Sequence, residues 1–211
     1  MEIELKYNIQ GKERADEIWA DPELTKFFEE DSQQTNFMKA IYFDTADRRL
    51  GKEEIAFRVR LKGSSYIATL KWKGTSNEGL HIREEINVPV SGEICMIQPS
   101  ADIFRESEQG KRVQELVGDE PLESLLEMHF LRRTARIDID DSIFELAVDV
   151  GETVGDKGSV PICELELELF SGDQDAMLRF GAFLAEKYGL TPENESKFSR
   201  ALSVVSQPDS L

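Results

Sequence analysis

The chain of 211 residues has room for one domain, and its 40% hydrophobic and 32% charged residues are typical of a soluble protein with a core. Its formal net charge of −17 excludes general binding to nucleic acids or anionic membranes. The N-terminus has no basic region followed by an apolar stretch, and no apolar run is long enough to span a membrane. The two cysteines, Cys95 and Cys163, are isolated and fit a reducing compartment, so we expect a cytoplasmic protein.

Alternating polar and apolar residues predict a strand-rich first half of the chain. Five strands are expected, at residues 1–10, 34–45, 54–63, 65–74 and 79–90. Between the first two, residues 13–31 carry apolar side chains at helical intervals, and Asp21 and Pro22 mark a break or a new helix start. Gly63 marks the turn of a hairpin between the third and fourth strands.

The second half begins with a helical and loop-like region over residues 91–126, which glycines and prolines punctuate. Three more strands are expected, at residues 129–140, 142–152 and 161–170. An amphipathic helix is predicted over 172–190, and a short helix follows at 195–205. The chain is therefore expected to form one domain of about eight antiparallel strands, residues 1–203, followed by a tail, residues 204–211.

The charged faces of these strands are segregated by sign. Because side chains alternate between the two faces of a strand, Glu2, Glu4 and Lys6 share one face of the first strand. Acids dominate the first strand and the last two, whereas bases dominate the middle ones. Between Ile55 and Arg83 there are six basic residues and one acid, although the chain as a whole is strongly acidic. A surface made for solubility would instead carry scattered charges of both signs.

Two architectures explain strands with one apolar and one charged face. An antiparallel sheet with one face in water is the ordinary explanation. The alternative is a closed barrel with its charged side inward, which requires that every buried charge be paired or that a ligand fill the lumen. Residues two apart on one face lie about 7 Å apart, so Glu2 and Glu4 could hold divalent cations. The basic strands match the oxygens of a polyanion, and together these features favour a polyphosphate bound with metal.

Eight motifs follow one another along the chain: EIELK (2–6), IYFDTADRRL (41–50), FRVR (57–60), TLKWKG (69–74), GLHIREE (79–85), FELAVDVGE (144–152), CELELEL (163–169) and ESKFSRAL (195–202). In this order they resemble the CYTH superfamily, also called triphosphate tunnel metalloenzymes, whose signature is Glu-x-Glu-x-Lys. The similarity runs from residue 2 to about residue 203. It is strongest toward the bacterial inorganic triphosphatase branch.

The resemblance implies a mainly β fold with flanking helices (α+β), in which eight antiparallel strands form a closed tunnel with a charged lumen. It implies that Mg²⁺ or Mn²⁺ binds to carboxylates drawn from Glu2, Glu4, Glu85, Asp149, Glu164, Glu166 and Glu168. Which two of the three glutamates at 164, 166 and 168 bind metal stays open. Phosphate contacts are implied for Lys6, Arg58, Arg60, Lys71, Arg83, Arg132 and Lys197, with Lys73, Arg136 and Arg200 on matching faces.

The activity that the resemblance implies is hydrolysis of inorganic triphosphate to pyrophosphate and phosphate, with Glu4, Lys6, Glu166 and Glu168 as the catalytic set. The last three are all candidates for the general base. A class IV adenylate cyclase, a thiamine triphosphatase or another organic triphosphate hydrolase would share the scaffold, and a polyphosphate- or nucleotide-binding module is the non-enzyme alternative.

The expected partner is a small molecule that contains a triphosphate, with no nucleic acid and no membrane. The residues carry no signal for oligomeric state, and no helical phosphate-binding domain is expected after the tunnel. Asp44 is interpreted as a turn or helix-cap residue, and His81 and His129 as packing or hydrogen-bonding residues.

Overall fold

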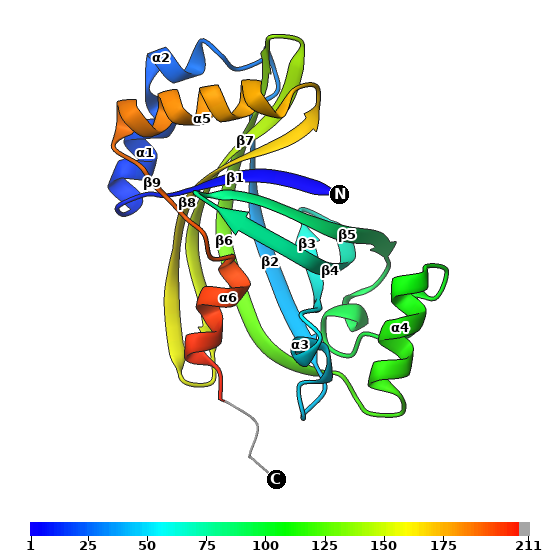
Figure 1. Ribbon diagram of the computed structural model, residues 1–211. Coiled ribbons are helices and arrows are strands. Elements are labelled where there is room, and N and C mark those ends of the chain that lie inside the picture. Colours follow the sequence, from blue (N-terminus) through cyan, green and yellow to red (C-terminus); the bar gives the residue numbers. More distant parts are fainter. Residues whose placement is uncertain (207–211) are drawn as a thin grey trace.

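The computed structural model describes residues 1–206, in which one antiparallel sheet curls into a closed tunnel with helices around it (Figure 1). The strands are β1 (Glu2–Asn8), β2 (Gln34–Asp44), β3 (Ala56–Lys62), β4 (Ser65–Asn77), β5 (Leu80–Val90), β6 (Glu123–Ile139), β7 (Ser142–Gly155), β8 (Gly158–Ser171) and β9 (Thr191–Pro192). Their order is β5-β4-β3-β2-β6-β7-β8-β1-β9, and a pairing of β1 with β5 closes the ring of the first eight. The expected closed eight-stranded antiparallel tunnel is therefore confirmed.

Within residues 1–206, six α-helices and three short 3₁₀ helices pack against this sheet. They are α1 (Lys12–Ala20), α2 (Pro22–Thr25), α3 (Arg49–Lys52), α4 (Glu108–Val117), α5 (Gln174–Tyr188) and α6 (Lys197–Ala201), with η1 (Glu93–Met96), η2 (Ala101–Phe104) and η3 (Leu202–Val204). In the described part of the chain, none of the helices has the length and apolar character needed to cross a membrane. Of the tail expected from residue 204, Val205 is buried, and residues 207–211 lie outside the described residues.

One strand begins earlier than expected. The helical and loop-like region expected up to residue 126 is wrong at its end, because residues 123–126 form the first part of β6. Leu126 pairs with Tyr42 of β2, and a bulge in that pairing follows Tyr42. Tertiary pairing with an existing strand therefore outweighs the local helical pattern.

β1 completes the tunnel because it pairs on both sides. Its first half pairs with β5, with Glu2 opposite Arg83, and its second half pairs with β8, with Lys6 opposite Glu166. The turn before β5 is bound to β1 by a hydrogen bond from the Lys6 N–H to the Gly79 carbonyl (2.8 Å). Gly79 has φ 82°, and a Cβ there would lie 2.5 Å from the Lys6 oxygen, so this closure requires glycine.

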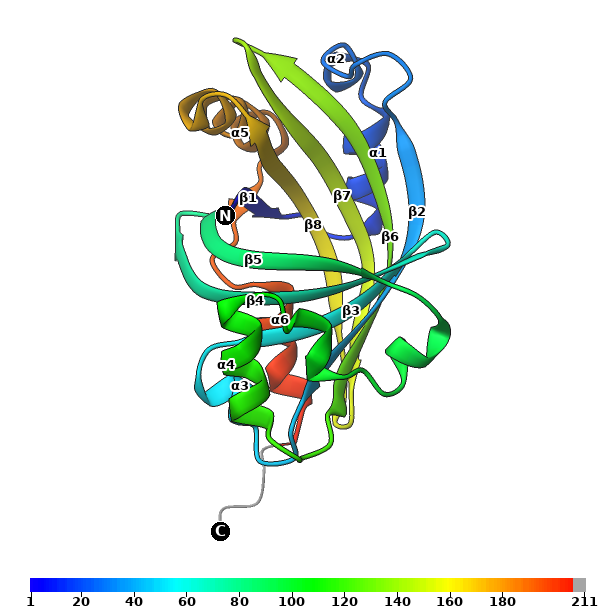
Figure 2. The ribbon, with the colours of Figure 1, turned by 90° about the vertical axis from the view of Figure 1, so that its right-hand side faces the viewer.

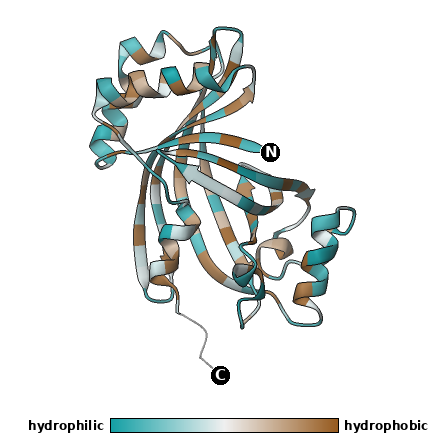
Figure 3. Ribbon diagram, in the orientation of Figure 1, coloured by the Kyte–Doolittle hydropathy of each residue, from teal (hydrophilic) through white to brown (hydrophobic). Residues whose placement is uncertain are grey.

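Apolar clusters cover the outside of the tunnel at both ends. One lies between β1, β7, β8 and the helices α1, α2 and α5, and the other between β2 to β5 and the segment from η1 to α4 (Figure 2). α5 packs so closely on β1 that a Cβ at Gly181 would lie 2.2 Å from Leu5 Cδ2. Hydrophobic and hydrophilic residues alternate along the strands (Figure 3), so the apolar faces pack outward and the charged faces point into the lumen.

A third apolar cluster lies inside the tunnel, at the end occupied by α6. It includes Met38, Tyr42 and Phe130 from the strands and Ala201 from α6. The Phe198 ring of α6 stacks on Tyr42, with centroids 4.7 Å apart. This contact holds α6 against the inner side of the sheet. The first residue of α6, Lys197, places its positive charge in the lumen.

Candidate functional site

A cavity of about 180 Å³ occupies the lumen of the tunnel. Of the seventeen side chains predicted for the site, twelve line it: Glu2, Glu4, Lys6, Arg58, Arg60, Lys71, Arg83, Glu85, Arg132, Glu166, Glu168 and Lys197. They come from β1, β3, β4, β5, β6, β8 and α6, because each strand turns its charged face inward. The lumen therefore gathers charges that lie far apart in the sequence.

Five predicted side chains do not line the cavity. Asp149 and Glu164 are completely buried behind the lining, and Arg200 pairs with Glu164 there. Lys73 is exposed and has φ 52°, within a bulge of β4. Arg136 is also exposed and forms an ion pair with a surface glutamate. The structure therefore places the first three beside the tunnel site and the last two away from it.

The wall next to α6 has its charges balanced by ion pairs. Arg132 donates to both oxygens of Asp149 (2.7 and 2.5 Å) and to Glu166 (2.5 Å). The Lys197 ammonium lies 2.7 Å from Glu166, 2.8 Å from Glu164 and 2.9 Å from Asp149. Such geometry can offset the cost of burying these charges. We call the set Arg132, Asp149, Glu164, Glu166, Lys197 and Arg200 the paired wall.

The ion pairs of the paired wall control the charge of Glu166. Burial alone would raise the pKa of its carboxyl, but Lys197, Lys6 and Arg132 outweigh burial and hold the pKa well below its usual range. Burial would likewise lower the pKa of the Lys197 ammonium, yet Asp149 and Glu166 raise it. Both groups therefore remain ionised together, and Glu166 is a weak base.

The opposite wall is different, because its guanidinium Nε groups lack acceptors and few of its other donors are engaged: Arg58 Nη2 contacts Thr69 (3.3 Å) and Arg83 Nη2 contacts His81 (2.9 Å). The Nε atoms of Arg58, Arg60 and Arg83 are buried, and none has a hydrogen-bond partner within residues 1–206. The charge of Arg58, together with burial and Arg132, lowers the pKa of Arg60 to about 10. Like charges crowded together with free buried donors are expected where an anion binds. We call Arg58, Arg60 and Arg83 the open wall.

Three carboxylates lie beside the open wall, on neighbouring strands. Glu4 of β1 pairs with Glu168 of β8 in the backbone register, and Glu2 lies two residues before Glu4 on the same face. Burial, followed by the charges of Glu2 and Glu4, raises the pKa of Glu168 to about 7. Glu2 pairs with Lys71 (2.6 Å) and Glu4 with Lys6 (3.1 Å), whereas Glu168 has no ion pair among the described residues. Burial and the neighbouring negative charges therefore oppose ionisation of Glu168.

These carboxylates fit a hard divalent cation only in part. Within residues 1–206, no three His, Cys, Asp or Glu side chains converge closely enough to hold a metal ion by themselves. Mg²⁺ in phosphate-processing sites usually takes one or two carboxylates, and substrate phosphates and waters complete its shell. Glu2, Glu4 and Glu168 supply that type of donor next to a wall suited to phosphate. The donor set is therefore compatible with Mg²⁺ or Mn²⁺ that binds together with a phosphate ligand.

Two residues that sequence reasoning left out of the site have structural partners. Asp44 is buried and accepts hydrogen bonds from the N–H groups of Leu50 (2.9 Å) and Gly51 (3.0 Å), so it holds the turn of α3. His81 is 1% exposed and lies between Arg83 and the backbone of Glu193.

Sequence reasoning missed some uncharged residues of the lumen. Tyr42, Phe130 and Asn87 line the tunnel cavity beside the charged residues. The alternation of β2 and β6 could have found Tyr42 and Phe130, because they share a face with other inward residues. Because neither residue is charged at neutral pH, the charge pattern of the strands does not identify them.

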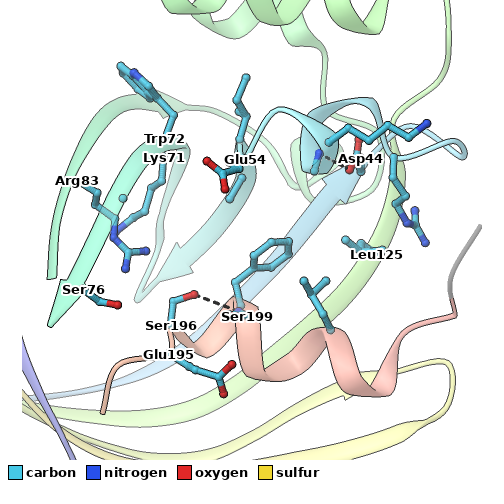
Figure 4. Close-up of a pocket in the computed structure, with 18 of the residues that line it drawn as sticks. Asp44, Glu54, Lys71, Trp72, Ser76, Arg83, Leu125, Glu195, Ser196 and Ser199 are labelled. Carbon is cyan, nitrogen blue, oxygen red and sulfur yellow. Dashed lines mark hydrogen bonds between the residues drawn. The ribbon is translucent and has the colours of Figure 1, made fainter. Parts of the chain in front are cut away.

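A second cavity, of about 640 Å³, adjoins the lumen between the ends of β3 to β5 and the segment Asn194–Ser206. Lys71 and Arg83 border both cavities, as do Ser196 and Phe198. Figure 4 shows Lys71 and Arg83 on one side of this space and Ser196 on the other, where the Ser196 hydroxyl accepts a hydrogen bond from the Ser199 N–H at the start of α6. The larger cavity is therefore a vestibule of the tunnel.

The fold and the charged lumen together define a class of protein. The sequence profile of the CYTH domain family matches residues 1–202, and the chain belongs to that family. An inorganic triphosphatase of Haemophilus influenzae is 28% identical over 152 residues, which are 70% of this chain and 40% of that protein. The chain therefore spans about 40% of the length of this relative.

Solved structures show the same fold. A proposed adenylyl cyclase from Hippeastrum, described as having a dominant triphosphatase activity, superposes with a TM-score of 0.73 at 21% identity, covering 99% of this chain and 98% of that one. A proposed adenylate cyclase from Bacillus halodurans gives a TM-score of 0.58 at 21% identity, covering 95% and 96% of the two chains. At these identities the likeness concerns the fold.

Proposed function

We propose that this protein is a metal-dependent hydrolase that cleaves inorganic triphosphate to pyrophosphate and phosphate inside its tunnel. The observation that carries the proposal is the set of three buried guanidinium Nε groups without acceptors, which share one cavity with three neighbouring carboxylates. The inorganic triphosphatase of Haemophilus influenzae supports the choice of substrate.

The open wall would bind the phosphate chain. Arginine presents several N–H donors in a planar fork, which suits the oxygens of a polyanion. Lys6 and Lys71 add positive charge to the lumen, where Lys6 contacts Glu4 and Lys71 contacts Glu85. The tunnel cavity is small and lined mostly by charge, so it suits a compact polyanion.

Glu2, Glu4 and Glu168 would hold Mg²⁺ or Mn²⁺, with Glu85 close to Lys71 as a further acidic residue. When bound, such an ion neutralises phosphate charge, polarises the phosphoryl group under attack and makes a bound water more acidic. The arginines and lysines orient the phosphate chain and stabilise charge that spreads over the transferring phosphoryl group.

The pKa values separate the candidates for proton transfer. Glu166 is held ionised by Lys197, Lys6 and Arg132 and is therefore a poor acceptor of a proton. Glu168, with a pKa of about 7, is better matched to a general base. Metal ligation and proton transfer are alternative roles for Glu168. Glu168→Gln distinguishes them, because loss of turnover with unchanged metal affinity would identify the proton-transfer role.

The test is a phosphate-release assay with Mg²⁺ and with Mn²⁺ against inorganic triphosphate, thiamine triphosphate and ATP, in which cyclic AMP is measured in parallel. We expect inorganic triphosphate to be cleaved fastest, and only when one of the metals is present. Cyclic AMP as the main product from ATP would overturn the proposal, and so would the absence of turnover of every triphosphate.

The vestibule favours a second candidate, hydrolysis of an organic triphosphate. Its volume of about 640 Å³ and side chains such as Leu125 and Phe198 offer room for an organic group whose phosphates enter the tunnel. In the same assay, a kcat/KM for thiamine triphosphate or ATP above that for inorganic triphosphate would favour this candidate.

A further inference from the structure

His81 lies directly behind the open wall, and both of its ring nitrogens are engaged. The ring is on β5, two residues before Arg83, and only 1% of the residue is exposed. Nδ1 lies 2.9 Å from Nη2 of Arg83, and Nε2 lies 2.7 Å from the carbonyl oxygen of Glu193. A buried imidazole with two polar contacts of this length is fixed in orientation.

The partners determine the tautomer of the ring. A guanidinium stays protonated and has only donors, so Nδ1 of His81 must accept the hydrogen bond from Arg83. A carbonyl oxygen can only accept, so Nε2 must carry the proton and donate to Glu193. The ring is therefore neutral, with its proton on Nε2.

The contact with His81 is the main restraint on Arg83. Within residues 1–206 it is the one side-chain hydrogen bond of this guanidinium, since the nearest carboxylate oxygen, on Glu2, is 4.0 Å from Nε. Nε itself is buried without an acceptor and borders the tunnel. The hydrogen bond from Arg83 Nη2 to His81 therefore fixes the guanidinium while its Nε–H remains available to a ligand in the lumen.

The other side of His81 contacts the segment that leads into α6. The Glu193 N–H donates to the Lys6 carbonyl (3.0 Å), and its carboxylate accepts from Asn8 (2.7 Å) and pairs with Arg200 (3.1 Å). This segment is therefore fixed to β1 and gives His81 a rigid backing.

We propose that His81, as the neutral Nε2–H tautomer, is a positioning residue that fixes the Arg83 guanidinium for binding a phosphate oxygen in the tunnel. The proposal rests on the proposed function for the identity of the anion. It assigns no contact between His81 and the substrate, because the imidazole acts through Arg83.

The tautomer can be measured without substrate by ¹⁵N NMR of the two imidazoles in the chain, His81 and His129. The variant His129→Gln assigns the two sets of signals. We expect His81 to show a protonated Nε2 and an unprotonated Nδ1 at neutral pH. An imidazolium, or a ring with its proton on Nδ1, would overturn the proposal whatever the activity of the protein.

Two substitutions separate the two contacts, because an asparagine amide reaches about as far as Nδ1 and a glutamine amide about as far as Nε2. His81→Asn keeps an acceptor for Arg83, whereas His81→Gln keeps a donor for the Glu193 carbonyl. Binding of inorganic triphosphate is measured by calorimetry in the presence of EDTA, after thermal melting has shown that each variant folds. We expect about tenfold weaker binding for His81→Gln and a smaller loss for His81→Asn. His129→Gln is the matched control and should bind as the unmodified protein does.

A double-mutant cycle, in which His81→Gln and Arg83→Gln are made singly and together, distinguishes positioning of Arg83 from a general structural effect on triphosphate binding. If His81 acts through Arg83, His81→Gln adds less than about twofold to the loss already caused by Arg83→Gln. Equal losses in both backgrounds, or a greater loss for His81→Asn than for His81→Gln, would overturn the proposal. If the unmodified protein binds triphosphate but fails to cleave it, only the proposed function is overturned.

Discussion

The two walls of the tunnel differ in whether their buried charges are paired within the protein. On the paired wall, Lys197 contacts three carboxylates and Arg132 contacts two, so charges of both signs are matched within the protein. On the open wall, Arg58 and Arg60 repel each other and keep buried donors without acceptors. The paired wall is therefore neutralised within the protein itself, whereas under the proposed function the open wall and its neighbouring carboxylates would be neutralised by a bound ligand.

The largest effect is expected when the carboxylate cluster beside the open wall loses a charge. Glu4→Gln should lower metal-dependent triphosphate turnover by about a hundredfold to a thousandfold, because metal and phosphate are no longer held together. Phosphate release at saturating Mg²⁺ measures the loss, and a thermal melt checks folding. Glu84→Gln, on the same sheet but exposed, is the control. Full activity of Glu4→Gln would rule out the metal assignment.

The paired wall should respond in stability. Lys197→Met leaves three buried carboxylates without their shared cation, which we expect to cost about 3 kcal/mol, or about 6–12 °C in Tm. Thermal unfolding at neutral pH in EDTA measures it, with the exposed Lys12→Met as control. An unchanged Tm would mean that the paired wall does not stabilise the fold.

Removing the charge of Glu168 should stabilise the protein in the absence of metal. The folded-state pKa is about 7 against an ordinary value of 4.5, so stability falls as pH rises through this window, where the unfolded chain releases the proton first. Glu168→Gln should therefore gain about 1–3 kcal/mol at pH 8 in EDTA and much less at pH 5. Chemical unfolding at both pH values tests this, and an equal gain at both would contradict it.

The smallest effect on stability is expected on the open wall itself. Arg60→Gln removes a positive charge that the neighbouring Arg58 repels, so Tm should change by less than about 2 °C. Arg132→Gln removes a charge that Asp149 and Glu166 stabilise, so it should lower Tm by several degrees. The affinity for triphosphate should nevertheless fall in Arg60→Gln. A large loss of stability in this variant would show that the two walls do not differ as described.

Much of the tunnel could be predicted from alternation alone, because a period of two places every second side chain of β1, β3 and β8 on the inner face. Alternation fails to predict the position of Lys73, which does not point into the tunnel. The bulge between Trp72 and Thr75 breaks the register of β4 just before the strand leaves the tunnel. Arg136 has the expected periodicity, but it lies near the far end of the long strand β6, where Glu29 pairs with it.

The division into two walls could not be predicted from the sequence. It depends on which strands meet across the lumen, and therefore on register and closure. Arg132 and Asp149 are seventeen residues apart and pair because β6 and β7 form a hairpin in one particular register. Lys197 reaches Glu166 only because α6 is seated inside the tunnel, which depends on the Phe198 contact with Tyr42. Sequence identified the charged residues, and tertiary structure decided which of them are neutralised.

The way β1 closes the tunnel has a consequence for biosynthesis. β1 precedes all other strands in the sequence, yet its ladder partners are residues 80–83, 164–168 and 191–192. Contacts that span such long loops form late, and a chain emerging from the ribosome cannot make the second set until β8 has been synthesised. Glu2 and Glu4 therefore stay apart from Glu168 at least until β8 has been synthesised. A shorter nascent chain carries Glu2 and Glu4 but not the assembled cluster, so under the proposed function ligand binding can begin only as the tunnel closes.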